Sequence, residues 1–167
     1  MLAPIFFVTL VAAQPSRTFA EFHRRAYESA LLNKDLRWFE VVSAPNFTFE
    51  SPGCPQLNRK QWLEELKTGF GMMTVLAVKS KLLRVRPKGA GLAITWECDE
   101  TVRFTPAKYH NLYFYTNAKP SEPIKPSSRY RIVTRYEEFW SMTGNDWKIH
   151  VQKATSNKTT VEESPAK

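Results

Sequence analysis

Glu138 and Glu100 are the side chains of this sequence best suited to moving protons. They lie in Tyr130–Met142 and Leu92–Phe104, two segments rich in β-branched and aromatic residues that predict long strands. Because side chains alternate between the two faces of a strand, each glutamate shares the more apolar face of its segment. A carboxyl group in such surroundings has a raised pKa, as a general acid or base near neutral pH requires. Both are therefore candidate catalytic residues.

The same alternation identifies the other side chains that we expect to face the interior. They are Ile94, Trp96, Cys98, Val102 and Phe104 on one strand, and Tyr130, Ile132, Thr134, Tyr136 and Trp140 on the other. Pockets for small molecules are mostly apolar with few polar groups. The candidate ligand-binding residues are therefore the large aromatic ones, namely Trp38, Trp96, Tyr130, Tyr136 and Trp140. Packing in the core is the alternative role for each of them.

Structural roles remain open for the two glutamates as well. Glu138 would then pair with an arginine or with a buried tyrosine hydroxyl. Glu100 would instead occupy a solvated position at the rim of the domain. The sequence alone does not choose between these roles and proton transfer.

The histidines show no spacing that predicts a metal site. On the last strand Ile149 and Val151 are expected to face inward, which turns His150 outward. His23 and His110 lie in other elements, with no metal-ligand spacing to each other or to the cysteines. The sequence also lacks a glycine-rich phosphate loop, a nucleophile elbow and a Cys-x-x-Cys pair. We predict neither a metal nor a cofactor.

Three helices are predicted to hold these strands in place. Thr18 and Glu21 form a capping-box pattern at the start of a helix over Phe19–Leu32. The inward face of this helix is expected to carry Phe19, Phe22, Ala26 and Ala30.

The second and third predicted helices are shorter. Asp35 is a suitable cap for a helix that ends before Pro45, since the residue preceding proline disfavours helical geometry. Asn58 and Gln61 form another capping box, and the helix after them should end at Gly69–Gly71.

One short strand and four long ones are predicted. Phe47–Glu50 alternates apolar and polar residues and is followed by a turn, after which the chain returns beside it as far as Leu57. The four long antiparallel strands are Val75–Val85, Leu92–Phe104, Tyr130–Met142 and Trp147–Thr155. Tight turns are expected at Pro87–Gly91 and Thr143–Asp146.

Three segments fall outside this pattern. Residues 1–14 predict an export signal, because the apolar segment Ile5–Val11 is followed by small residues. No basic side chain precedes this apolar segment, and the alternative is an uncleaved terminus or a misassigned start codon. The prolines of residues 106–128 predict an insertion or long loop that extends a hairpin, covers the domain or binds a partner. Residues 156–167 are polar and predict a disordered tail. The expected location is secreted or periplasmic.

Composition is that of one folded domain. Of the 167 residues 43% are hydrophobic, yet no apolar run approaches the ~20 residues of a membrane-spanning helix, so integral membrane association is not expected. The 24 basic and 16 acidic residues give a net charge of +8, but the basic ones are scattered, so no nucleic-acid partner is predicted. Cys54 and Cys98 allow either one disulfide or two free thiols.

The order of these elements resembles that of the nuclear transport factor 2-like superfamily, including its SnoaL-like and ketosteroid-isomerase-like members. Similar local patterns occur in Asp35–Phe39, Ala44–Phe49, Leu57–Leu63 and the hairpin Glu138–Trp140 with Asp146–Ile149. In that hairpin Glu138 replaces the usual aspartate. The likeness covers roughly residues 18–153, interrupted by the proline-rich insertion.

The resemblance implies an α+β, cone-shaped fold over residues 18–155, with three N-terminal helices packed on a curved, mostly antiparallel sheet. It also implies an internal pocket and often a homodimer through the outer face of the sheet. Because the superfamily includes isomerases, dehydratases, cyclases and proteins without catalysis, the fold does not select a function.

Three hypotheses follow. The first is an exported domain that binds a small apolar molecule without catalysis. The second is an isomerase, dehydratase or cyclase in which Glu138 transfers the proton and Tyr130 or Tyr136 donates a hydrogen bond to the reacting oxygen. The third is an interaction module that dimerises through the outer sheet face, with Arg129, Arg131, Val133, Arg135, Glu137 and Phe139.

Overall fold

The computed structural model describes residues 17–105 and 128–163. The predicted export signal at 1–14, nearly all of the predicted insertion at 106–128 and the last four residues lie outside the described residues. The elements are α1 (Arg17–Asn33), α2 (Leu36–Val42), β1 (Ser43–Glu50), β2 (Leu57–Asn58), α3 (Arg59–Met72), β3 (Met73–Lys88), β4 (Gly91–Phe104), β5 (Arg129–Thr143) and β6 (Asp146–Glu163).

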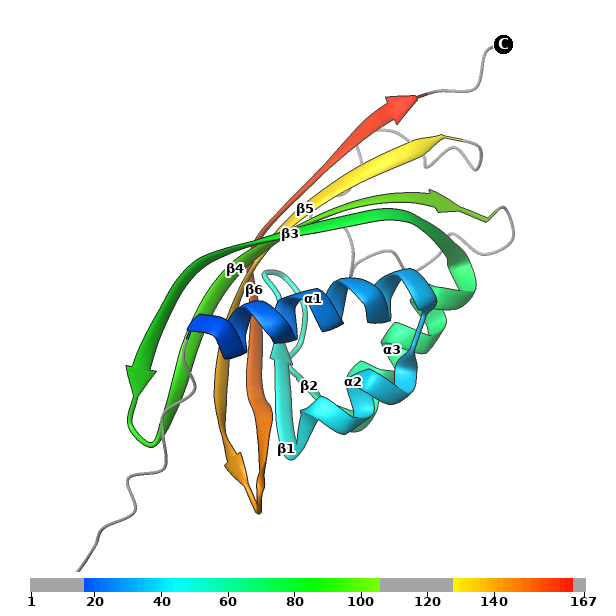
Figure 1. Ribbon diagram of the computed structural model, residues 1–167. Helices are drawn as coiled ribbons and strands as arrows, with labels where there is room; N and C mark the ends of the chain where they lie inside the picture. Colours follow the sequence, from blue (N-terminus) through cyan, green and yellow to red (C-terminus); the bar gives the residue numbers. More distant parts are fainter. Residues whose placement is uncertain (1–16, 106–127, 164–167) are drawn as a thin grey trace, which may run out of the picture.

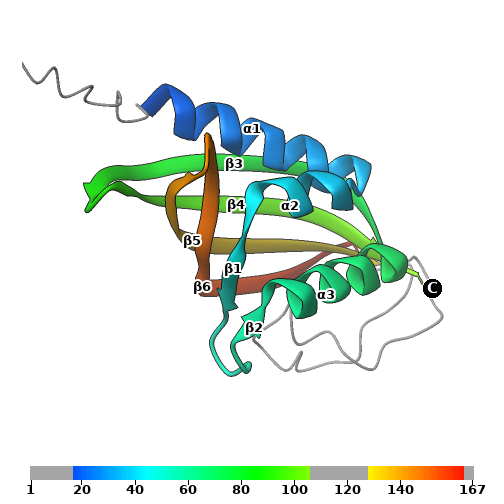
Figure 2. The ribbon, with the colours of Figure 1, turned by 90° about the horizontal axis from the view of Figure 1, so that it is seen from below.

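Six strands form one curved sheet in the order β2-β1-β6-β5-β4-β3. All neighbouring strands are antiparallel except β1 and β6, which pair in parallel. The long strands bend around the three helices, which lie on the concave side of the sheet (Figure 1). The view from below shows α1 running along β3, while α3 lies beside β1 and β2 (Figure 2). The predicted α+β fold, with three N-terminal helices on a curved and mostly antiparallel sheet, is confirmed.

Two of the predicted helix caps are present. The Asp35 carboxylate accepts a hydrogen bond from the backbone N–H of Trp38 at 3.1 Å and so begins α2. At α3, the Asn58 side chain accepts from the Gln61 N–H at 3.0 Å, and the Gln61 side chain accepts from the Asn58 N–H at 3.0 Å. Such reciprocal bonds satisfy backbone donors that a helix leaves free at its start.

The prediction for the first helix needs two corrections. The helix already includes Arg17, so Thr18 lies inside its first turn and does not cap it. The predicted inward face was wrong at Phe22, which is 67% exposed, although Ala30 is buried and Phe19 packs against the core as predicted. The buried residues of α1 are Ala20, Tyr27, Ala30 and Leu31. The helix is rotated because the small alanines allow it to approach the sheet closely and the Tyr27 ring fills the space between them.

The four long strands are confirmed, but β6 continues well past its predicted end. Residues 156–163 pair with Arg129–Arg135 of β5, so most of the predicted disordered tail is strand. The polar composition of these residues does not prevent strand pairing, because backbone hydrogen bonds join the strands and an antiparallel sheet can expose one face to solvent. Both predicted tight turns carry a glycine in the left-handed region, Gly89 with φ 56° and Gly144 with φ 64°.

The cysteines do not form the disulfide that the sequence left open. Cys54 is half-buried and Cys98 is buried, and both are free thiols. Within the described ranges, no helix is both long enough and apolar enough to cross a bilayer.

Candidate functional site

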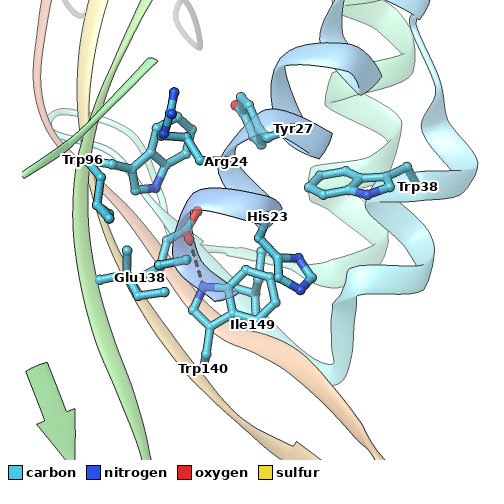
Figure 3. A pocket seen from close by; sticks show the side chains of 11 residues that line it. His23, Arg24, Tyr27, Trp38, Trp96, Glu138, Trp140 and Ile149 are labelled. Carbon is cyan, nitrogen blue, oxygen red and sulfur yellow. Dashed lines mark hydrogen bonds between the residues drawn. The ribbon is translucent and has the colours of Figure 1, made fainter. Parts of the chain in front are cut away.

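Two small cavities lie between the helices and the concave face of the sheet, and Tyr27 of α1 borders both. The His23 cavity has a volume of about 10 Å³. Its walls include His23, Arg24, Trp38, Trp96, Glu138 and Trp140, which converge from α1, α2, β4 and β5 (Figure 3). The Glu100 cavity has a volume of about 30 Å³. Its walls include Phe49, Trp62, Glu65, Glu100, Tyr136 and Gln152.

The structure therefore divides the site residues that the sequence suggested. Trp38, Trp96, Trp140 and Glu138 line the His23 cavity, whereas Tyr136 and Glu100 line the other one. Tyr130 lines neither cavity; its ring packs against that of Phe104 at a centroid distance of 5.4 Å.

Glu138 is buried and its carboxylate is held from two sides. The indole Nε1–H of Trp140 donates to one oxygen at 2.8 Å (Figure 3), and the amide of Gln152 donates to the other at 2.8 Å. Burial raises the pKa of Glu138, and hydrogen bonds from Trp140 and Gln152 oppose the rise. The indole of Trp96 also opposes it from nearby, although its N–H makes no hydrogen bond of standard geometry. The expected arginine or tyrosine partner was wrong.

A β-bulge explains why Gln152 reaches this carboxylate. Trp140 lies opposite Ile149, but Phe139 lies opposite Val151, so His150 is an extra residue on β6. The inner face therefore changes phase. Val151 was predicted to face inward but lies on the outer face, and Gln152 is buried in its place.

His150 is fixed at the bulge by polar neighbours. Its Nδ1 and the Oδ1 of Asn46 are 2.9 Å apart, and its Nε2 lies 3.2 Å from the Thr143 hydroxyl. These contacts explain the position of His150, and its side chain lines neither the His23 cavity nor the Glu100 cavity.

Three buried polar atoms that line the His23 cavity have no hydrogen-bond partner among the described residues. They are Nδ1 of His23, Nε of Arg24 and Nε1 of Trp96. Burial lowers the pKa of His23 to about 4, so its ring is neutral at pH 7.

The guanidinium of Arg24 is fixed by a network that joins α1 to β3. Its Nη1 donates to the Glu28 carboxylate at 2.9 Å and to the Ser80 hydroxyl at 2.8 Å, and it also contacts the Ser80 carbonyl oxygen. The Glu28 carboxylate in turn accepts from the Ser80 backbone N–H at 2.7 Å. Because one end of the guanidinium is fixed, its Nε is held in place at the cavity.

Glu100 is 3% exposed, so the expected solvated rim position was wrong. The Cys98 thiol donates a hydrogen bond to its Oε1 at 3.4 Å, while Oε2 has no hydrogen-bond partner among the described residues. Burial raises the pKa of Glu100 to about 7, with a smaller opposing effect from the Cys98 contact. The carboxyl group therefore changes its protonation state in the neutral range.

Sequence reasoning missed several residues of these walls, among them Glu65 at the Glu100 cavity. His23, Arg24 and Tyr27 are consecutive positions of one face of α1, and the small residues Ala20 and Ala30 beside them were an available signal for that face. Gln152 had no comparable signal, since its inward position depends on the bulge in β6.

The outer face of the sheet carries a separate hollow of about 230 Å³. It lies over β3, β4, β5 and β6, and its walls include Arg86, Lys88, Phe139, Val151 and Lys153. The Lys88 ammonium lies 5.3 Å from the centroid of the Phe139 ring. Within the described part of the chain, no three potential metal ligands lie close enough together to hold an ion.

The sequence matches no protein-family model and no curated protein, but its fold matches solved structures over most of its length. A conserved protein from Planctomyces limnophilus superposes with a TM-score of 0.63 at 9% identity, over 87% of this chain and 99% of that one. An NTF2-like protein of unknown function from Prochlorococcus marinus superposes with a TM-score of 0.60 at 10% identity, over 86% of this chain and 95% of that one. An NTF2-like protein from Cytophaga hutchinsonii superposes with a TM-score of 0.51 at 13% identity, over 85% of this chain and 99% of that one.

At such low identity, structural similarity establishes the fold and not the activity. The element order, the curved sheet and these superpositions agree. The chain has the nuclear transport factor 2-like fold.

Proposed function

We propose that this domain binds a small molecule that has a flat apolar body and a carbonyl or carboxylate oxygen, and that the His23 cavity receives the oxygen. The observation that carries the proposal is the set of three unpartnered buried atoms around one cavity, on His23, Arg24 and Trp96. Arg24 Nε is an N–H donor and requires an acceptor. Trp96 Nε1 is a second donor, which lies near the Glu138 carboxylate but does not reach it with hydrogen-bond geometry. A buried donor without a partner costs about 1–3 kcal/mol, which an acceptor oxygen would recover.

The size of the cavity limits what enters it. About 10 Å³ is the space of one water molecule, so a ligand oxygen fits while a ring does not. The body of the ligand would take the place now filled by the half-buried Trp38 side chain. Trp38 lies on the short helix α2 and packs edge-on against Phe39 and Tyr27. Binding therefore requires movement of this indole, and the flat rings around it offer an apolar surface.

The indole N–H of Trp96 is the most direct reporter of binding. We expect acetophenone and benzoate to shift the Trp96 Nε1–H signal in NMR titrations of the full chain, because the oxygen accepts this hydrogen bond. Toluene, which lacks the oxygen, should bind at least about tenfold more weakly, as one hydrogen bond to a buried donor is worth about 1.4 kcal/mol.

Two variants complete this test. Trp96→Phe removes the donor and should weaken acetophenone binding about tenfold. Trp147→Phe is the matched control, because Trp147 is half-buried against the core and lines neither cavity. Equal affinity for toluene and acetophenone, or a Trp96 signal that does not move, would contradict an oxygen-binding role for this cavity.

A second candidate function, proton transfer, has support from the place of Glu138. Its carboxyl group has a raised pKa and lines the same cavity as the donors on Arg24 and Trp96. A carbonyl oxygen held by these donors would make a proton on the adjacent carbon more acidic, and Glu138 would accept that proton. This is the first half-reaction of an isomerase.

We expect the chain to catalyse deuterium exchange of the acetophenone methyl protons in D₂O, followed by NMR. Glu138→Gln should bind acetophenone with similar affinity and lose the exchange, because an amide does not accept the proton. Exchange that continues in this variant would remove Glu138 from the mechanism. No exchange in the wild-type chain, with binding intact, would leave the non-catalytic function.

Export and a homodimer through the outer sheet face stay predictions. The outer face offers Phe139 and Val151 beside the 230 Å³ hollow, which a partner side chain would fill. Much of its charge is already paired within the chain, as in the contact between Arg131 and Asp99 at 2.6 Å.

A further inference from the structure

We infer that the Glu100 cavity is a second binding site, which takes a primary ammonium group at the end of an aliphatic chain. This inference is independent of the proposed function, because it concerns a different cavity and the opposite ligand charge. Two carboxylates, on Glu100 and Glu65, line this cavity, and none of the described residues of its wall is cationic. This arrangement contrasts with the net charge of +8 of the whole chain.

Glu100 supplies the polar contact at the bottom of the site. It is 3% exposed, and its Oε2 makes no hydrogen bond within the described residues although it lies in a protein interior. The weak S–H donor of Cys98 reaches only the other oxygen, at 3.4 Å. An ammonium group has three N–H donors and no acceptor, so it satisfies this oxygen and neutralises the buried charge.

Aromatic rings form much of the remaining wall, and they come from four different elements. The rings are those of Tyr27, Phe49, Trp62 and Tyr136. Ring faces attract a cation by about 0.5–2 kcal/mol when water is excluded, and they attract a neutral group of the same shape much less.

These walls are fixed by their own packing. Trp62 packs against Phe47 at a centroid distance of 4.5 Å, and Tyr27 packs against Trp96 at 4.7 Å. A fixed wall costs little conformational entropy when a ligand binds.

The volume and the rim limit the shape of the ligand. About 30 Å³ holds two water-sized groups, which corresponds to an ammonium group and the methylene next to it. Glu65 and Leu66, both half-buried on α3, border the cavity and give its route to solvent. An aliphatic tail would run past Leu66, while a trimethylated ammonium would be too wide.

Protonation of Glu100 should control this binding. Its pKa of about 7 means that the carboxyl group is mostly neutral at pH 6 and mostly ionised at pH 8. The titratable groups around it are Cys98 and Asp99 on β4, Tyr27 on α1, Glu65 on α3 and Tyr136 on β5. None of these is a cation that would replace the ligand. Since an ammonium group binds the ionised form, affinity should rise roughly tenfold from pH 6 to pH 8.

The test is calorimetric titration of the full chain with n-butylamine at pH 6 and pH 8. We expect binding that is roughly tenfold tighter at pH 8, and no comparable binding of 1-butanol, which has the same chain without the charge. Equal binding of 1-butanol, or no n-butylamine binding at pH 8, would overturn the inference.

Three variants locate the contact. Glu100→Gln keeps the shape of the neutral side chain and should lose at least tenfold in affinity together with the pH dependence. Glu65→Gln, at the rim, should weaken binding about threefold without disturbing the fold. Glu64→Gln is the matched control, since Glu64 is the exposed neighbour on α3 and does not line the cavity. Unchanged affinity in both Glu100→Gln and Glu65→Gln would place the amine elsewhere.

Discussion

Replacing Phe39 by alanine is expected to lower the free energy of unfolding by about 4 kcal/mol, the range of buried phenylalanine truncations. Phe39 has no exposed surface. The centroid of its ring lies 5.4 Å from that of Tyr27 on α1, and 5.7 Å and 6.1 Å from those of Trp62 and Phe70 on α3. This ring therefore joins the three helices to one another. Urea unfolding followed by circular dichroism measures the loss.

Phe22→Ala is the matched control for this prediction. Phe22 lies on α1 with 67% of its surface exposed, so the same truncation should change stability by no more than about 0.5 kcal/mol. Equal losses in the two variants would contradict the orientation of α1 described above, because Phe22 would then have to face the core.

Gly91→Ala is expected to lower the free energy of unfolding by about 3 kcal/mol, at the upper end of the overpacking range. A Cβ atom at this position would lie 2.1 Å from the backbone carbonyl oxygen of Trp140 and 2.9 Å from the Phe139 ring. The carbonyl belongs to the β4–β5 ladder, and Trp140 also holds the Glu138 carboxylate, so neither moves easily. Thermal and urea unfolding of the variant measure the effect.

Gly71→Ala separates this clash from the general effect of replacing a glycine. Gly71 lies in α3, where an added Cβ meets nothing within 4 Å. Alanine there should stabilise the chain by up to about 1 kcal/mol, because glycine is a poor helix former. A Gly91→Ala variant as stable as the wild type would mean that β4 and β5 separate at this end without cost.

The inner faces of β4 and β5 were predictable because strand alternation is local. Ile94, Trp96 and Glu100 are buried on β4 as the period of two requires, and Glu138 and Trp140 are buried on β5. The phase of β6 was not predictable in the same way. His150 is an extra residue only in relation to its partner strand β5, so the sequence of β6 alone gives no signal for the bulge.

The burial of the candidate site residues was also not predictable from the sequence. Glu100 has the same position on its strand whether it is solvated or buried, and the difference arises from the helices that cover it. The rotation of α1 has a similar origin, because both Phe22 and Tyr27 suit an apolar face and only packing against the sheet selects Tyr27. Local patterns thus identified the residues that face inward, while tertiary packing decided which of them meet.

The order of the strands leaves β3 at one edge of the sheet, with backbone groups open to pairing with another molecule. Its exposed positions carry Lys79, Lys81, Arg84, Arg86 and Lys88, and Pro87 removes a backbone donor near its end. The opposite edge is β2, which has only two residues. A second chain that docked edge to edge along β3 would bring rows of like charge together. These five basic side chains therefore disfavour aggregation through the β3 edge of the sheet.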